Sequence, residues 1–145
     1  MKTSYLLSSK FSFAEHGAFA VSATLVISGG EGYFRPGDVL DHMTRLIGRG
    51  VPFDSQQYTE LGQWIHRADD IVAPMRVDDE SYYAWVDPNF WDLDPHLGIY
   101  TKSDFMMLFE DCCRNFVAEH TDRAEEFAHA LSVNGISLLP TTARP

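Results

Sequence analysis

Residues 101–117 read TKSDFMMLFEDCCRNFV, and they form the clearest helical pattern in the chain. Apolar side chains recur in this stretch at intervals of three and four, at Phe105, Leu108, Phe109, Cys112 and Phe116. This spacing places them on one face of a helix, where so broad a stripe must pack against other helices. The first four residues, TKSD, offer two alternative caps for the helix start. The stretch therefore predicts a long helix with a largely helical core around it.

Toward the amino terminus, residues 12–28 combine a capping box, Ser12 with Glu15, with an alanine-rich interior and a stop at Gly29-Gly30. These three signals favour a helix. The residues from Phe19 to Ile27 also alternate as they would in a half-buried strand. A strand over residues 18–28 therefore stays open as an alternative.

Three more helices are predicted from their capping and terminating residues. Their expected bounds are Pro36 to Gly48 or Gly50, Ser55 to about Val72, and Thr121 to Asn134-Gly135. The second of them rests on apolar side chains spaced by threes and fours, beginning with Tyr58, Leu61 and Ile65.

Two short segments favour β-structure, residues 81–86 with their Tyr, Trp and Val side chains and residues 97–100. The sequence thus predicts a single domain over residues 1–145 that is mainly α, with about four to five helices and a small β hairpin or ribbon. The alternative is an α+β fold in which residues 18–28 form a strand. Residues 137–145 have no period and are expected to be a loose tail.

The composition is that of a globular protein, with 145 residues of which 45% are hydrophobic and 22% charged. Its two cysteines, Cys112 and Cys113, are adjacent, and a disulfide between such neighbours would be strained. Reduced thiols are typical of the cytosol. No apolar run approaches the ~20 residues that cross a bilayer, and no signal peptide is expected. A soluble, cytoplasmic protein is therefore expected.

The most unusual chemistry lies in residues 78–94, which read DDESYYAWVDPNFWDLD. This stretch holds six carboxylates and five aromatic rings but no lysine or arginine. Carboxylates attract a basic partner from a distance, and aromatic rings anchor it after docking. The spacing leaves open whether Trp85, Phe90 and Trp91 lie in the core or in solvent. We expect a partner-binding surface formed by Asp78, Asp79, Glu80, Tyr82, Tyr83, Trp85, Asp87, Trp91, Asp92 and Asp94.

No catalytic residue, metal or cofactor is expected. The six histidines are scattered, and the chain contains neither HExxH nor CxxC. The best metal candidate is the set Asp92, Asp94 and His96, but Pro95 interrupts the alternation that would align the three side chains. A formal net charge of −10 disfavours direct binding of nucleic acid or membranes.

In size, charge and its acidic aromatic stretch, the chain resembles the immunity proteins that bacteria carry against their own toxin domains, as in contact-dependent growth inhibition. The resemblance implies a non-enzymatic cytoplasmic inhibitor of a basic partner, such as a nuclease toxin domain. One alternative is a phage-type nucleic-acid mimic or anti-defence protein, in which carboxylates copy the spacing of phosphates. Another is a small acid hydrolase, which would need two carboxylates from separate elements in one pocket.

Overall fold

The computed structural model describes residues 13–28, 33–54, 58–66 and 76–136. Four of the sequence predictions fall outside these residues. They are the Ser12 cap, the Gly29-Gly30 stop, the helix start at Ser55 and the loose tail over residues 137–145.

The described elements are helices and short strands. In chain order they are α1 (Phe13–Ser28), α2 (Val39–Met43), a π-helical turn (Thr44–Gly48), β1 (Phe53–Asp54), β2 (Thr59–Gln63), a 3-10 turn (Trp64–His66), β3 (Tyr82–Val86), β4 (Leu97–Tyr100), α3 (Lys102–Glu119), a second 3-10 turn (Thr121–Arg123) and α4 (Ala124–Val133). None of the helices in the described ranges is long and apolar enough to cross a bilayer.

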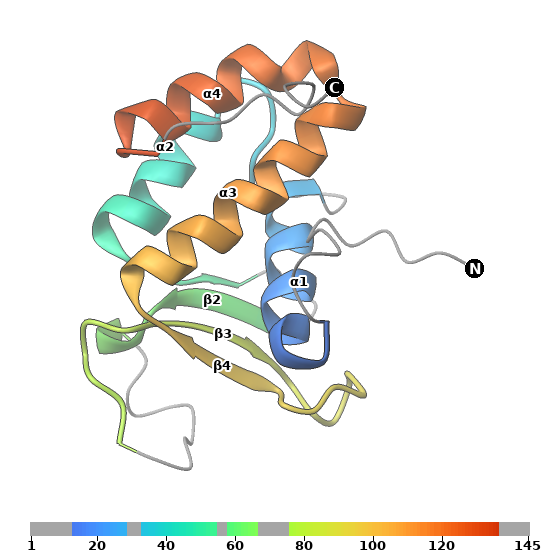
Figure 1. The fold of residues 1–145 in the computed structure, drawn as a ribbon, viewed down its shortest axis with the longest axis vertical. Coiled ribbons are helices and arrows are strands. Elements are labelled where there is room, and N and C mark those ends of the chain that lie inside the picture. Colours follow the sequence, from blue (N-terminus) through green and yellow to red (C-terminus); the bar gives the residue numbers. More distant parts are fainter. Residues whose placement is uncertain (1–12, 29–32, 55–57, 67–75, 137–145) are drawn as a thin grey trace, which may run out of the picture.

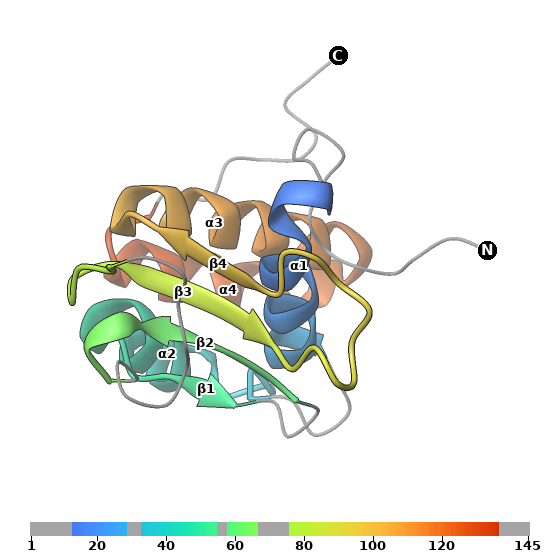
Figure 2. The same ribbon diagram turned by 90° about the horizontal axis from the view of Figure 1, so that it is seen from below.

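The strands form one antiparallel sheet in the order β1-β2-β3-β4. The helices stand on one side of this sheet, with α1 across its middle and α3 beside it (Figure 1, Figure 2). The fold of the described chain is therefore α+β. The prediction of a mainly α protein with only a hairpin is partly wrong, because the sheet has more strands than β3 and β4.

The additional central strand comes from a segment for which we predicted a helix. Thr59–Gln63 is strand β2, so the expected helix from Ser55 to about Val72 is wrong where the chain is described. Of the apolar residues that suggested it, Leu61 is buried, whereas Tyr58 and Ile65 are 51% and 56% exposed. Their spacing by threes and fours was a coincidence, because β2 pairs with a strand on each side and is fixed by those partners. The alternative α+β fold had placed its extra strand at residues 18–28, and that segment is helical.

The other predicted elements in the described chain are confirmed. Residues 13–28 are helical, and the helix expected after Pro36 is present as α2 and the π-helical turn. The hairpin is present as β3 and β4. Thr101 caps α3 by accepting a hydrogen bond of 3.0 Å from the backbone N–H of Asp104. After α4 the chain turns at Gly135, whose φ of 82° is in the region that favours glycine.

The apolar stripe of α3 lies in the core, as its spacing predicted. All five of its members are buried: Phe105, Leu108, Phe109, Cys112 and Phe116. Phe109 is in the middle of the stripe, with its ring centroid 5.8 Å from that of Phe34 and 6.2 Å from that of Phe105. The Phe105 ring in turn contacts Phe19 of α1 and Tyr82 of β3. Helix α3 thus joins α1 and the sheet into one core.

Replacing Phe109 with alanine should lower the free energy of unfolding by about 3 to 5 kcal/mol, because it removes a fully enclosed ring. Glu125→Ala is the matched control, since Glu125 is exposed on α4 and its loss should change little. Urea unfolding followed by circular dichroism measures both. Equal effects would show that the stripe does not hold the core together.

The two cysteines are free and fully buried. Burial raises the pKa of both thiols, and the negative charge of Glu110 raises it further. The folded chain therefore holds the thiol protons more tightly than the unfolded chain does. This contribution to stability is complete at neutral pH and is lost as the pH rises above the ordinary thiol range.

The free energy of unfolding should therefore fall between pH 8 and 9.5, by up to about 1.4 kcal/mol per pH unit for each thiol. Urea unfolding in the presence of a reductant measures this slope. The double variant Cys112→Ala, Cys113→Ala should be less stable at pH 7.5 but should show a flatter dependence on pH. An unchanged slope in the variant would contradict the assignment to the thiols.

Candidate functional site

Strand β3 divides the acidic stretch that the sequence presents as continuous. Asp78, Asp79 and Glu80 precede the strand, whereas Asp87, Asp92 and the other acid of the following loop come after it. Figure 1 and Figure 2 show the turn before β3 and the loop after it at opposite ends of the strand. At ~3.3 Å per residue, the two groups of acids are roughly 20 Å apart. The predicted surface is therefore two separate sites.

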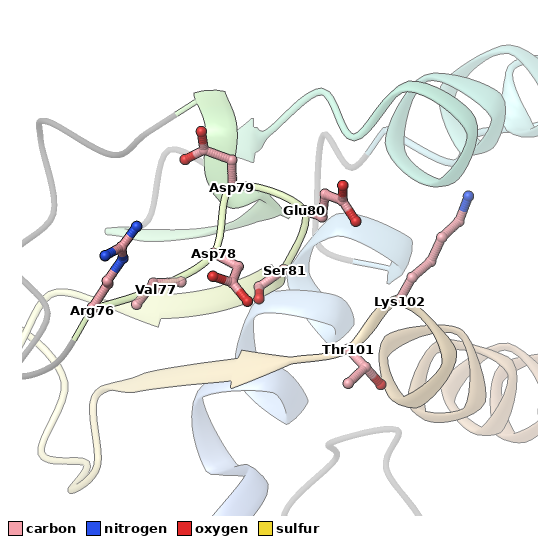
Figure 3. A pocket seen from close by; sticks show the side chains of 8 residues that line it. All are labelled: Arg76, Val77, Asp78, Asp79, Glu80, Ser81, Thr101 and Lys102. Atoms are coloured by element: carbon pink, nitrogen blue, oxygen red, sulfur yellow. The ribbon is translucent and has the colours of Figure 1, made fainter.

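The first site is a hollow of about 620 Å³ beside the turn that precedes β3 (Figure 3). It is lined by Arg76, Val77, Asp78, Asp79, Glu80, Ser81, Thr101 and Lys102. The three acids are exposed, and they come from a single turn closed by the hydrogen bond from Ser81 N–H to the Asp78 carbonyl, 3.0 Å long. Two basic side chains share the lining with them, so the hollow has mixed charge.

Tyr82 and Tyr83 are not part of either surface, which corrects the sequence prediction. Their rings are 2% and 0% exposed. Successive strand residues point to opposite faces of a sheet, and both faces of β3 are covered. Tyr82 faces the helices and donates a hydrogen bond of 2.8 Å to the carbonyl of Ile47. Tyr83 faces the other way and donates its hydroxyl hydrogen to the carboxylate of Glu60.

Trp85 belongs to a small apolar cluster on the face of the sheet away from the helices. The buried members of this outer cluster are Trp64 and Tyr83, and Val77, Trp85, Leu97 and Ile99 pack against them partly exposed. Trp85 stands opposite Glu60 on β2 and Leu97 on β4. It can therefore offer only part of its ring to a partner.

The second site is the loop between β3 and β4, residues 87–96. Asp87 organises its first turn, because its carboxylate accepts a hydrogen bond of 2.9 Å from Asn89 N–H and its carbonyl accepts from Phe90 N–H at 3.0 Å. Trp91 is half-buried and packs against the main core. Asp92 and Asp94 are exposed. The loop thus has a structured base and an acidic outer surface.

The aromatic feature that sequence reasoning missed is a stacked pair at the base of this loop, Tyr58 with Phe90. Their centroids are 3.6 Å apart and their planes differ by 6°, yet the two residues are 51% and 59% exposed. Tyr58 has a φ of 64°, a left-handed conformation that costs a tyrosine about 1 to 2 kcal/mol. The pairing register of β2 and β3 brings Tyr58 to this end of the sheet, and nothing in the local sequence around either ring signals that meeting.

The geometry offers no evident catalytic or metal centre in the part of the chain that the structure describes. No group of three histidine, cysteine or acidic side chains that could hold a metal ion occurs among these residues, and this includes Asp92, Asp94 and His96. The acids that line the hollow come from one turn, so they do not face one another across it as a hydrolase pair would.

Comparison with known proteins gives no relative from which a function could be transferred. No protein-family model matches the chain, and neither a curated protein nor a solved structure matches it. A function can therefore be argued only from the surface chemistry described above.

Tyr83→Phe should lower the free energy of unfolding by about 1 to 3 kcal/mol, because the buried Glu60 carboxylate loses a hydrogen-bond donor. Tyr58→Phe removes the same hydroxyl from an exposed ring and should have little effect. Urea unfolding at pH 7 compares the two variants. If they are equally stable, the hydroxyl of Tyr83 contributes nothing to the fold.

Proposed function

We propose that the protein is a non-catalytic cytosolic inhibitor that binds a basic protein partner, as bacterial immunity proteins bind toxin domains. The observation that carries this proposal is the exposed pair Tyr58 and Phe90 beside the acidic loop. The resemblance in size and charge to immunity proteins suggests the kind of partner.

Exposed aromatic rings support a binding role. Single exposed apolar side chains are normal, and Ile65, Met107 and Val133 are such residues here, whereas exposed apolar side chains that contact one another mark interaction sites. Aromatic residues are enriched at the centres of protein interfaces, where a few of them supply most of the binding free energy. Tyr58 and Phe90 have the exposure that such a role requires.

The charge supports a basic partner. The chain has 21 acids and 11 lysines and arginines, a formal net charge of −10. Such a field speeds encounter with a basic protein and disfavours acidic ones. The loop of residues 87–96 adds three acids and contains no lysine or arginine. Its acids therefore share one short loop with Phe90.

The rings also bear on the alternative of nucleic-acid mimicry. A mimic needs carboxylates at regular intervals, whereas stacked exposed rings contribute nothing to a copy of the phosphate backbone. The acids of residues 78–94 fall into two groups at opposite ends of β3. The ring pair is the feature that favours a specific protein partner.

The test of inhibition starts from the neighbouring reading frame. If it encodes a large secreted protein with a variable carboxy-terminal domain, that domain is produced in cells with and without this chain. We expect the domain alone to stop growth and equimolar co-production to restore it. Continued growth arrest, with both proteins present and folded, would refute the proposal.

Binding kinetics should separate the acids from the rings. Asp78→Asn, Asp79→Asn, Glu80→Gln together should mostly slow association and reduce its salt dependence, because exposed acids act through a field screened over ~8 Å. Phe90→Ala should instead speed dissociation and weaken the complex by about 2 kcal/mol, because an anchor contributes after docking. Surface plasmon resonance with the partner domain measures both rates.

Met107→Ala is the matched control for the ring variant, since Met107 is 51% exposed on α3. It should leave both rates unchanged. Unaltered kinetics in the folded acid and ring variants would mean that the interface lies elsewhere on the molecule.

A further inference from the structure

We propose that the Tyr58–Phe90 pair binds an arginine side chain of the partner, with the guanidinium on an exposed ring face and its N–H groups directed to the carboxylates of the loop. This inference rests on the proposed function and names the side chain that the partner presents. The observation behind it is a stacked, exposed ring pair at the base of a loop that has three acids and contains no lysine or arginine.

The ring pair is held in place before any partner arrives. Asp87 N–H donates a hydrogen bond of 2.8 Å to the carbonyl of Tyr58, which ties the residue before β2 to the start of the loop. Phe90 N–H and Trp91 N–H both donate to the carbonyl of Asp87, at 3.0 and 2.9 Å. The backbone segments that carry the two stacked rings are therefore tied together, which reduces the ordering that docking on the rings requires.

The strained backbone of Tyr58 is consistent with a binding role. A tyrosine with φ of 64° persists only where surrounding contacts hold it there. In this structure the left-handed conformation presents the ring at the surface, stacked on Phe90, where it is 51% exposed. Tyr58 also directly precedes β2, at the end of its connection from β1, where hairpins commonly use a positive φ.

Arginine fits this surface better than lysine does. Its guanidinium is planar and weakly hydrated, so it stacks on an aromatic face while its edge bonds to carboxylates in a fork geometry. A lysine ammonium is a compact, strongly hydrated charge without such a face. The exposed carboxylates of Asp92 and Asp94 belong to the same loop as Phe90. They supply carboxylate acceptors within that loop.

The hollow at the other end of β3 lacks this combination. Arg76 and Lys102 line it together with its three acids, and none of the described residues that line it is aromatic. An arginine that entered it would meet like charges as well as opposite ones. The preference for arginine should therefore belong to the ring pair and not to the acidic turn.

The experiment uses two blocked peptides of equal charge, tetra-arginine amide and tetra-lysine amide, titrated into the full chain at low salt. Ring-proton NMR shifts of Tyr58 and Phe90 report the binding. We expect the arginine peptide to bind about two- to fivefold more tightly, the range typical of exposed cation–π contacts. Equal affinity of the two peptides for the wild-type chain would overturn the proposal.

Three variants locate the effect. Phe90→Ala should bind both peptides with equal affinity, which is measured from the ring protons of Tyr58 and any other resonances that shift during the titration. Tyr58→Asn should do the same, and it keeps a residue type that tolerates the left-handed backbone. Met107→Ala should keep the arginine preference. A preference that survives in folded Phe90→Ala and Tyr58→Asn would overturn the proposal.

The peptide titration and the growth assay distinguish a failure of this inference from a failure of the proposed function. A chain that inhibits the toxin domain but shows no arginine preference refutes this inference alone. A chain that prefers arginine through the ring pair but fails to inhibit the domain supports the inference and refutes the inhibitor role.

Discussion

The fold depends on one constraint, that strand β3 is buried on both faces. Its adjacent residues Tyr82 and Tyr83 point in opposite directions. Each ring must be covered by other elements, and each buried hydroxyl needs a hydrogen-bond acceptor. Tyr82 meets the helices and the carbonyl of Ile47, whereas Tyr83 meets Trp64 and the carboxylate of Glu60. These two contacts require helices on one face of the sheet and an aromatic cluster on the other. The same strand also sets the distance between the acidic turn and the acidic loop.

Local signals predicted the helices that the structure describes, but they were not enough for the sheet, because periodicity also predicted a helix where β2 lies. The stripe from Phe105 to Phe116 predicts α3 because a helix face is defined within the segment itself. Strand β2 offers no such signal, since Thr59 and Glu60 are polar residues that are nonetheless buried. Their places are determined by partners that are far away in sequence, such as Tyr83 for Glu60. A pattern read from one segment cannot contain that information.

The candidate site shows the same limit. The acids and rings of residues 78–94 are adjacent in sequence, so they suggested one surface. The extended strand β3 lies between the two groups of acids and holds them apart by its own length. Sequence reasoning therefore found the acidic loop and misjudged Tyr82 and Tyr83, whose burial follows from the covering of both faces of β3. It also missed Tyr58, which joins Phe90 only through the register of β2 with β3. The exposure of the acids could be predicted from the sequence, whereas contacts between side chains that the sheet register brings together could not.

The separation of the two acidic groups limits what the net charge can do. Screening at physiological salt acts over ~8 Å, which is well below the roughly 20 Å between the groups. A partner docked at one end of β3 therefore feels the acids at the other end only weakly. The turn at Asp78 also has Arg76 and Lys102 beside it, which reduces its local field further. For the basic partner that we propose, recognition would then depend on the acids of the loop that carries Phe90 more than on the total of −10. Under this proposal the rings would determine which cationic side chain binds, and the more distant acids would mainly raise the rate of association.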